Sequence, residues 1–154
     1  MVGTLELGEV TQHNVRVLRL INQQVFPVSY NHRFYRDIIA LGEWSKLAFL
    51  DDLTIGAVCA RTEVKDNHKR CYIMTLGCLP HYRRLGVGEK LLNHILGQAR
   101  KEKVDVVTLH VQTNNDAALR LYEKNGFTVV ETKEGYYKKI TPADAYVLER
   151  RMNE

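Results

Sequence analysis

The feature that most constrains the fold is a stretch from Tyr72 to Ala99, which reads YIMTLGCLPHYRRLGVGEKLLNHILGQA. Residues Cys71–Leu79 carry no charge and predict a strand buried on both faces, which Pro80 ends. The basic turn Arg83–Gly88 follows and has the form R-x-x-G-x-G. Beyond it, apolar residues recur at helical spacing and predict an amphipathic helix: Val87, Leu91, Leu92, Ile95, Leu96 and Ala99.

A glycine turn that opens a helix is suited to hold a phosphate group. The first N–H groups of the helix lack internal partners, the helix dipole places partial positive charge there, and glycine allows close approach. A Walker loop requires G-x-x-x-x-G-K-[ST], which this turn lacks. A dinucleotide fingerprint requires a third glycine three residues after Gly88, where the chain has Leu91. The turn alone also fits a plain strand-to-helix connection.

The rest of the chain predicts a single mixed α/β domain over residues 1–154 in the order β-α-α-β-β-β-α-β-α-β-β. Further strands are predicted at Leu5–Val10, Leu47–Leu50, Ile55–Arg61, Val106–Val111, Phe127–Lys139 and Ala145–Arg151. Further helices are predicted at Gln12–Gln24, from Asn31 to Leu41 and from Asn114 or Asn115 to Asn125, with Thr11 and Asn31 as N-caps. The strand–helix–strand unit around the glycine turn is a parallel, right-handed crossover, and ligands in such sheets lie beyond the carboxyl ends of the parallel strands.

Composition excludes several classes of protein. The net charge of +4 is mild, and no dense basic run interleaves with aromatic residues, so we expect no direct binding of nucleic acid. No apolar run is long enough to span a membrane, and the start MVGTLELGEV is unlike a signal peptide, so we expect no membrane association. Cys59, Cys71 and Cys78 lack C-x-x-C spacing and lie in apolar runs, which indicates reduced core residues of an intracellular protein. The histidines show no metal spacing, so we expect no metal.

Strand alternation predicts that a tyrosine and a histidine converge. Tyr72 and Met74 point to one face of the central strand, and His110 shares a face of the next strand with Thr108 and Gln112. On adjacent parallel strands, the tyrosine and the histidine could reach one cavity. For either residue alone, an ordinary buried or half-buried side chain is the alternative.

Several segments resemble a known family. The R-x-x-G-x-G turn between a strand and an amphipathic helix resembles the acetyl-coenzyme A signature of the GNAT acetyltransferases. More closely, the chain resembles the NatE-type N-terminal α-amino acetyltransferases, the San family, in FPVSYN (Phe26–Asn31), YIMTLG (Tyr72–Gly77), LHVQ (Leu109–Gln112) and the YYK…ADA run (Tyr136–Ala145). The resemblance covers nearly the whole chain in order and implies the GNAT fold.

The resemblance implies an acetyl transferase that uses acetyl-coenzyme A and no metal. An α-amino group has a pKa of about 7.7–8.0 and must lose a proton before it attacks the thioester. The reaction therefore needs a general base. The family implies that His110 is this base, with Tyr72 helping to hold a water, and that the Tyr122 hydroxyl lies near the thiol sulfur. Backbone N–H groups around Leu76 would stabilise the charge on the thioester oxygen. The implied cofactor-binding residues are Leu76, Gly77, Cys78, Arg83, Arg84, Leu85, Gly86, Val87, Gly88, Asn115 and Tyr122; the alternatives are a helix cap for Asn115 and a core position for Tyr122.

An apolar peptide site is also implied. By resemblance, the first two residues of a peptide would contact Phe26, Pro27, Val28, Tyr30, Met74, Tyr136, Tyr137 and Ile140. Burying a methionine side chain is worth about 1.5–3 kcal/mol, so peptides that start with Met and an apolar residue, such as Met-Leu, are expected to be preferred. If the strand Phe127–Lys139 is regular, Tyr136 and Tyr137 point to opposite faces, and a core position is the alternative for one of them.

Other functions stay open. A lysine or small-amine acetyltransferase would face an ammonium with a pKa of about 10.4, and the apolar loop segments contain no carboxylate to favour it. A coenzyme A-binding scaffold subunit is the alternative of a different class. The resemblance implies nascent-chain N-termini as partners and association with the ribosome-bound NatA complex through its large auxiliary subunit. We expect a cytoplasmic protein and leave nuclear presence open.

Overall fold

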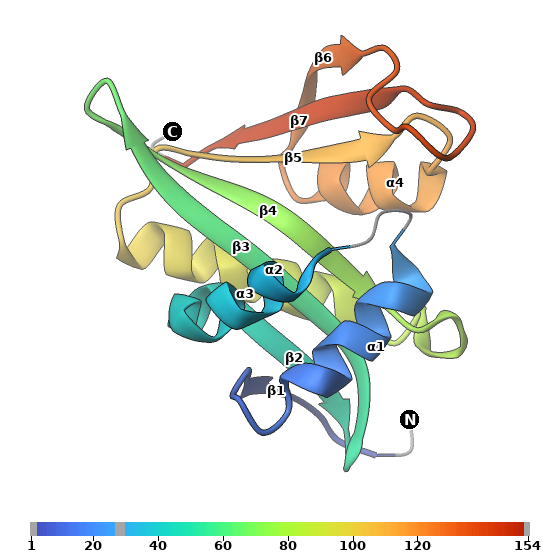
Figure 1. The fold of residues 1–154 in the computed structure, drawn as a ribbon. Helices are drawn as coiled ribbons and strands as arrows, with labels where there is room; N and C mark the ends of the chain where they lie inside the picture. The colour runs from blue at the N-terminus through green and yellow to red at the C-terminus, as the bar shows by residue number, and fades with distance from the viewer. Residues whose placement is uncertain (1–2, 27–29, 153–154) are drawn as a thin grey trace. The chain divides into compact units, whose positions relative to one another are not determined.

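The strands form one mixed sheet in the order β1-β2-β3-β4-β5-β7-β6 (Figure 1). The structure is a computed structural model that describes residues 3–26 and 30–152. In chain order the elements are β1 (Leu5–Glu9), α1 (Val15–Val25), α2 (His32–Ile38), η1 (Ile39–Trp44, a 3-10 helix), β2 (Ser45–Leu50), β3 (Leu53–Lys65), β4 (His68–Cys78), η2 (Pro80–Tyr82), α3 (Val87–Lys101), β5 (Val106–Gln112), α4 (Asp116–Lys124), β6 (Thr128–Lys133) and β7 (Ala145–Arg151). The predicted order of helices and strands is confirmed. None of the helices described is long and apolar enough to cross a membrane.

Two compact units make up the chain. The first unit contains the residues up to Arg61 together with Ile73–Gln98, and the second contains Thr62–Tyr72 together with the chain from Ala99 on. The strands β3 and β4 each contribute residues to both units. Each unit is described by itself below.

In the first unit, helices cover both faces of the sheet: α1 and α2 lie on one face and α3 on the other (Figure 1). One buried cluster joins Leu18 and Ile21 of α1 to Ile38 of α2 and to Leu47 and Ala57 of the sheet. On α3, the predicted apolar stripe is confirmed as buried: Val87, Leu91, Leu92, Ile95 and Leu96 in the first unit, and Ala99 in the second. Apolar burial of this kind is the main stabilising contribution to such a layered unit.

Glycine is required where β3, β4 and their neighbours approach closely. A Cβ atom on Gly56 would lie 2.8 Å from the carbonyl oxygen of Gly77 and 3.0 Å from Val87 Cγ1. A Cβ atom on Gly77 would lie 2.5 Å from Val25 Cγ1 and 3.0 Å from Phe26 Cζ. These two positions therefore let α3 start, and α1 end, directly against the sheet.

In the second unit, β5 lies between two partners. It pairs in parallel with β4 through Arg70–Val106, Cys71–Val107 and Tyr72–Thr108, which confirms the predicted parallel crossover. It pairs antiparallel with β7 along its whole length. The Thr108 hydroxyl donates a hydrogen bond to the Leu148 carbonyl oxygen at 2.9 Å and adds a side-chain link to this ladder.

The predicted ends of several elements were wrong. Helix α1 begins at Val15 rather than Gln12, because Thr11 starts a separate turn in which its N–H donates to Asn14 Oδ1 at 2.7 Å. The strands β3 and β4 run on to a tight turn at Asp66 and Asn67, whose φ angles are 55° and 65°. Such left-handed angles are typical of a two-residue hairpin, whereas the polar residues Lys65–Lys69 predict a longer loop. Asn31, in contrast, caps α2 as predicted: its Oδ1 accepts from the Phe34 N–H at 3.0 Å.

The predicted strand Phe127–Lys139 is also wrong at its C-terminal end. Strand β6 stops at Lys133, and Tyr136, Tyr137 and Ile140 lie in the following loop. This loop closes on itself, since the Tyr137 N–H donates to the Ala143 carbonyl oxygen at 2.8 Å. Strand alternation therefore does not decide where the two tyrosines point.

The three cysteines are free and buried, as predicted for core residues. Burial raises the pKa of the Cys59 and Cys71 thiols to about 12 and also raises the pKa of Cys78. The thiolate is the nucleophilic form, so these thiols are unreactive in the folded protein.

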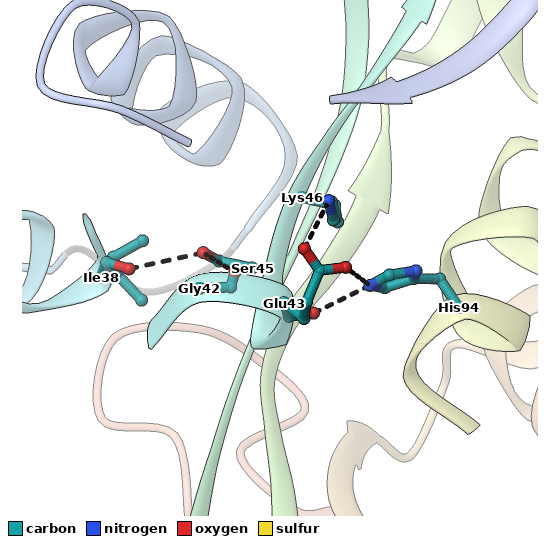
Figure 2. A network of polar contacts seen from close by, with 6 residues as sticks. All are labelled: Ile38, Gly42, Glu43, Ser45, Lys46 and His94. Atoms are coloured by element: carbon teal, nitrogen blue, oxygen red, sulfur yellow. Dashed lines mark hydrogen bonds and ion pairs between the residues drawn. The ribbon is translucent and has the colours of Figure 1, made fainter. Parts of the chain in front are cut away.

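A polar network anchors the segment between α2 and β2 (Figure 2). Lys46 Nζ lies 3.2 Å from Glu43 Oε2, and the Lys46 side chain is only 11% exposed. His94 Nε2, on α3, lies 2.8 Å from the Glu43 carbonyl oxygen, and the Ser45 hydroxyl donates to the carbonyl oxygens of Ile38 and Gly42. The Glu43 carboxylate thus compensates an ammonium group that is largely removed from water.

Glu43→Gln is expected to lower the free energy of unfolding by about 1–2 kcal/mol, because it leaves a largely buried ammonium without its counter-charge. Urea denaturation measures this. The control is Asp37→Asn, which breaks the exposed Arg33–Asp37 pair (79% and 66% exposed). That change is expected to cost less than about 0.5 kcal/mol. Equal losses in the two variants would contradict the assignment.

Candidate active site

Tyr72 and His110 meet in the second unit. The parallel register places Tyr72 of β4 opposite Thr108 of β5, so His110 follows on the same face of β5, two residues further on. Tyr72 Oη lies 2.6 Å from His110 Nδ1, and the two rings are edge to face with centroids 5.4 Å apart. The predicted convergence of these side chains is confirmed. Their catalytic role stays a prediction at this point.

The surroundings of His110 favour a neutral imidazole. Burial lowers the pKa of His110, the positive charge of Lys133 lowers it further, and Glu131 partly opposes this. The Tyr136 ring lies parallel to the imidazole, with centroids 4.3 Å apart and an interplanar angle of 9°. A neutral histidine held between two tyrosines is suited to accept a proton at neutral pH.

The free ring nitrogen of His110 decides what the pair can do. Nε2 is buried, and within the described residues it has no hydrogen-bond partner. If Nδ1 carries the proton, it donates to Tyr72 Oη, and Nε2 offers a lone pair as a proton acceptor. A buried polar atom of this kind calls for a water or a ligand group. The pair is therefore a candidate base that acts on a group bound at Nε2.

The loop after β6 adds an aromatic wall in the same unit. The Tyr136 and Tyr137 rings meet edge to face with centroids 5.0 Å apart. Tyr136 is 38% exposed, whereas burial, reinforced by Tyr136, raises the pKa of the half-buried Tyr137. Both hydroxyls are thus available as hydrogen-bond donors. Ile140 lies in this loop and is also partly buried.

Asn115 is a helix cap and Tyr122 is a core residue, as in the alternatives given for them above. Asn115 Oδ1 accepts from the Ala118 N–H at 3.2 Å and caps α4. Tyr122 is 5% exposed and lies edge to face with Phe127. Burial raises the pKa of Tyr122, so its hydroxyl stays protonated and can donate a hydrogen bond. The cofactor roles of Asn115 and Tyr122 stay predictions.

In the first unit, the basic turn opens α3 as predicted. Arg83, Arg84, Leu85 and Gly86 are exposed, and α3 begins at Val87, one residue before Gly88. Arg84 and Gly86 have φ angles of 78° and 77°, and a Cβ atom on Gly86 would have nothing within 4 Å. An open, left-handed glycine before a helix N-terminus, flanked by two exposed arginines, fits a phosphate-bearing ligand.

The end of β4 and the end of α1 lie together in the first unit. Gly77 abuts Val25 and Phe26, as described above, and the Leu79 N–H donates to the Ile55 carbonyl oxygen at 2.8 Å. Leu76 is half-buried, and the Cys78 thiol donates to the Leu79 carbonyl oxygen at 3.2 Å. The GNAT resemblance also implies that the central strand splays from its partner here and leaves unpaired N–H groups for pantetheine. This expectation, like the role of the N–H groups around Leu76 at the thioester oxygen, stays a prediction.

Tyr30 and Met74 form the other described part of the predicted peptide site. The Tyr30 hydroxyl donates to the Met74 carbonyl oxygen at 3.3 Å, and the Tyr30 ring stacks on Phe34 at 4.1 Å. The predicted residues Pro27 and Val28 lie outside the described residues. Thus the first unit contains Phe26, Tyr30, Met74 and the turn, while the second contains Tyr72, His110, Tyr136 and Tyr137.

The residues 15–127 match the model of the Acetyltransferase (GNAT) family. The chain belongs to the GNAT acetyltransferase family. N-alpha-acetyltransferase 50 of Danio rerio is 52% identical over 99% of this chain and 91% of its own length. The probable N-acetyltransferase san of Drosophila melanogaster is 51% identical over 97% and 82%. At these identities, the chain belongs to the N-alpha-acetyltransferase 50 (San) group of GNAT proteins, and the resemblance seen in the sequence is confirmed.

A solved GNAT structure shares the whole fold. Arabidopsis thaliana Naa50 in complex with the bisubstrate analogue CoA-Ac-MVNAL has a TM-score of 0.89 and 43% sequence identity, covering 95% of this chain and 97% of that one. The predicted fold class, a mixed α/β sheet of the GNAT type, is confirmed. Within the described residues, no group of three or more His, Cys, Asp or Glu side chains could hold a metal ion.

The residues that surround His110 were not predicted from the sequence. The stacking of Tyr136 on His110 depends on a loop that was predicted as strand. Glu131 and Lys133 were not singled out, although their alternation places both on one face of β6, the signal that could have found them.

NMR titration of the imidazole is expected to give His110 a pKa below its ordinary value of about 6.5, because burial disfavours the cation. Lys133→Ala is expected to raise this pKa, since a nearby positive charge is removed, and Glu131→Gln is expected to lower it. Lys103→Ala, in the turn before β5, is the control and should leave it unchanged. A pKa above about 6.5 in the wild-type protein would contradict the neutral-base assignment.

Proposed function

We propose that this chain transfers an acetyl group from acetyl-coenzyme A to the α-amino group of protein N-termini. The observation that carries the proposal is the 2.6 Å contact between Tyr72 Oη and His110 Nδ1, which leaves the buried Nε2 as a proton acceptor. Support comes from relatives at 52% and 51% identity, named N-alpha-acetyltransferase 50 and probable N-acetyltransferase san.

The residues of the basic turn fit the cofactor. We propose that Arg83–Gly88 holds the phosphates, through the N–H groups at the start of α3 and the two exposed guanidinium groups. In the first unit, Leu76, Gly77 and Cys78 would bind the pantetheine arm. In the second unit, Asn115 would form a hydrogen bond with pantetheine. When bound, acetyl-coenzyme A supplies an acetyl group activated as a thioester. The Arabidopsis relative was solved with a coenzyme A bisubstrate analogue, which supports this choice.

The chain's own residues would control the proton. An N-terminal ammonium with a pKa of about 7.7–8.0 is mostly protonated at neutral pH and cannot attack. We propose that His110 Nε2 takes its proton through a bound water, while Tyr72 fixes the ring through Nδ1 and Tyr136 through stacking. A positioned base of this kind contributes about 10²–10⁴-fold in rate. Tyr122, kept protonated by burial, would stabilise the departing thiolate by donating a hydrogen bond to it.

We further propose a preference for N-termini that start with Met and an apolar residue. In the first unit, Phe26, Tyr30 and Met74 supply apolar surface. In the second, Tyr136 and Tyr137 supply hydroxyl groups for a peptide backbone, beside Ile140. The analogue in the Arabidopsis relative carries the peptide MVNAL, which begins with Met and an apolar residue. Acetylation of lysine would be a secondary activity.

The cellular setting is proposed from the family resemblance alone. The chain would act on nascent chains at the ribosome, in association with the NatA complex through its large auxiliary subunit, in the cytoplasm and with nuclear presence open. A scaffold subunit that binds coenzyme A without needing its own catalysis is the second candidate. The Tyr72–His110 contact favours the enzyme, because a pure scaffold has no use for it.

His110→Ala is expected to lower kcat for a Met-Leu peptide by about 10²–10⁴-fold, because the base is removed. Tyr72→Phe should lower it by about tenfold, since the ring loses only its positioning bond. Coenzyme A binding, measured by calorimetry, should persist in both variants. The matched control is His68→Ala, an exposed histidine with a side chain 71% exposed, which should keep wild-type kcat. Wild-type kcat in both site variants would overturn the catalytic assignment.

A peptide panel tests the substrate class. It contains Met-Leu, Met-Lys, Ser, Ala and acidic starts, and a Lys peptide with a blocked N-terminus. Burial of a methionine side chain predicts kcat/KM values about 10- to 150-fold higher for Met-Leu than for Ser or Ala. Transfer only to the blocked Lys peptide would replace the proposal by lysine acetylation. No transfer at all, with coenzyme A still bound, would support the scaffold.

A further inference from the structure

The first unit contains a pocket that acetyl transfer does not use. It has a volume of about 360 Å³ and is lined from α1, α2 and their flanking residues. We name it the arginine pocket, after its lining residues Gln12, His13, Val15, Arg16, Arg19, His32, Tyr35, Arg36 and Ile39. None of them belongs to the basic turn, the Tyr72–His110 pair or the predicted peptide site.

The lining of the arginine pocket concentrates positive charge without compensation. Arg16 and Arg19 lie one turn apart on α1, Arg36 comes from α2, and no carboxylate lines the pocket. Among the described residues, the ion pairs found involve none of these three arginines. Arg33, which like Arg36 lies on α2, does pair with a carboxylate, that of Asp37. Like charges gathered in one concave site repel each other unless an anion neutralises them.

The floor of the pocket is fixed by buried polar contacts. Tyr35 is 5% exposed, and the Arg19 guanidinium lies over its ring, 4.9 Å from the centroid. The Tyr35 hydroxyl accepts a hydrogen bond from Asn22 Nδ2 at 3.2 Å, and Asn22 is 1% exposed. The cation–π contact therefore holds one guanidinium in place above a ring that is itself anchored in the core.

The guanidinium groups, the volume of the pocket and the short length of the basic surface indicate the kind of ligand. Guanidinium groups match phosphate oxygens with paired hydrogen bonds, and about 300 Å³ or more is enough for a small molecule. The charge is also confined, because the rest of α1, from Leu20 to Val25, is uncharged. An extended nucleic-acid backbone needs a longer basic stripe. We propose that the arginine pocket binds a compact, multiply charged phosphate compound, of the size of a pyrophosphate or a short polyphosphate.

The test uses the full chain saturated with coenzyme A, so that the basic turn is occupied. Inorganic pyrophosphate and tripolyphosphate are titrated at constant ionic strength, and backbone amide shifts are followed by NMR. Saturable shifts are expected at Gln12–Arg19 and His32–Ile39. The affinity should fall about tenfold or more in Arg16→Gln and in Arg36→Gln, two exposed residues whose replacement keeps the fold. Acetyl transfer should be unchanged in both.

Arg33→Gln is the matched control, because it removes the same charge from the same helix but outside the pocket. It should change the affinity less than about twofold. Equal weakening in all three variants would overturn the site in favour of general surface charge, and shifts confined to Arg83–Gly88 would assign the anion to the turn. Tighter, arginine-dependent binding of a twelve-nucleotide single-stranded RNA would overturn the ligand class.

Discussion

The parallel pairing of β4 with β5 is the constraint on which the candidate active site depends. Its register puts Tyr72 opposite Thr108, and the two-residue period of a strand then brings His110 onto the face of Tyr72. A shift of one residue would turn the histidine to the opposite face and break the 2.6 Å contact. A pair of side chains built on adjacent strands is therefore as rigid as the sheet itself.

Two opposite electrostatic environments occur in this chain. The turn Arg83–Gly88 and the arginine pocket both present exposed arginines, which suits the phosphate-bearing ligands proposed for them. In contrast, burial and the charge of Lys133 lower the pKa of His110, which suits the base proposed for the ammonium. The two environments differ in solvent exposure. An exposed side chain keeps its charge at little cost, whereas burial disfavours the charged form.

Much of this architecture could be predicted from the sequence, for identifiable reasons. The apolar stripe of α3 depends only on local period and is confirmed. The meeting of Tyr72 and His110 depends on strand alternation and on the parallel pairing of their strands, which the crossover rule predicts, and it is also confirmed. The turn at Asp66 and Asn67 and the loop that holds Tyr136 could not be predicted in this way. The first depends on left-handed angles at residues other than glycine, and the second on long-range hydrogen bonds such as Tyr137 to Ala143.

The buried cysteines have a practical consequence. Cys59 and Cys78 belong to the first unit and Cys71 to the second, and burial raises the pKa of all three thiols. Alkylation must then wait for a local opening that exposes the sulfur to solvent. The rate at which each cysteine is modified would measure how often its own unit opens, and the protein carries these reporters without any introduced label.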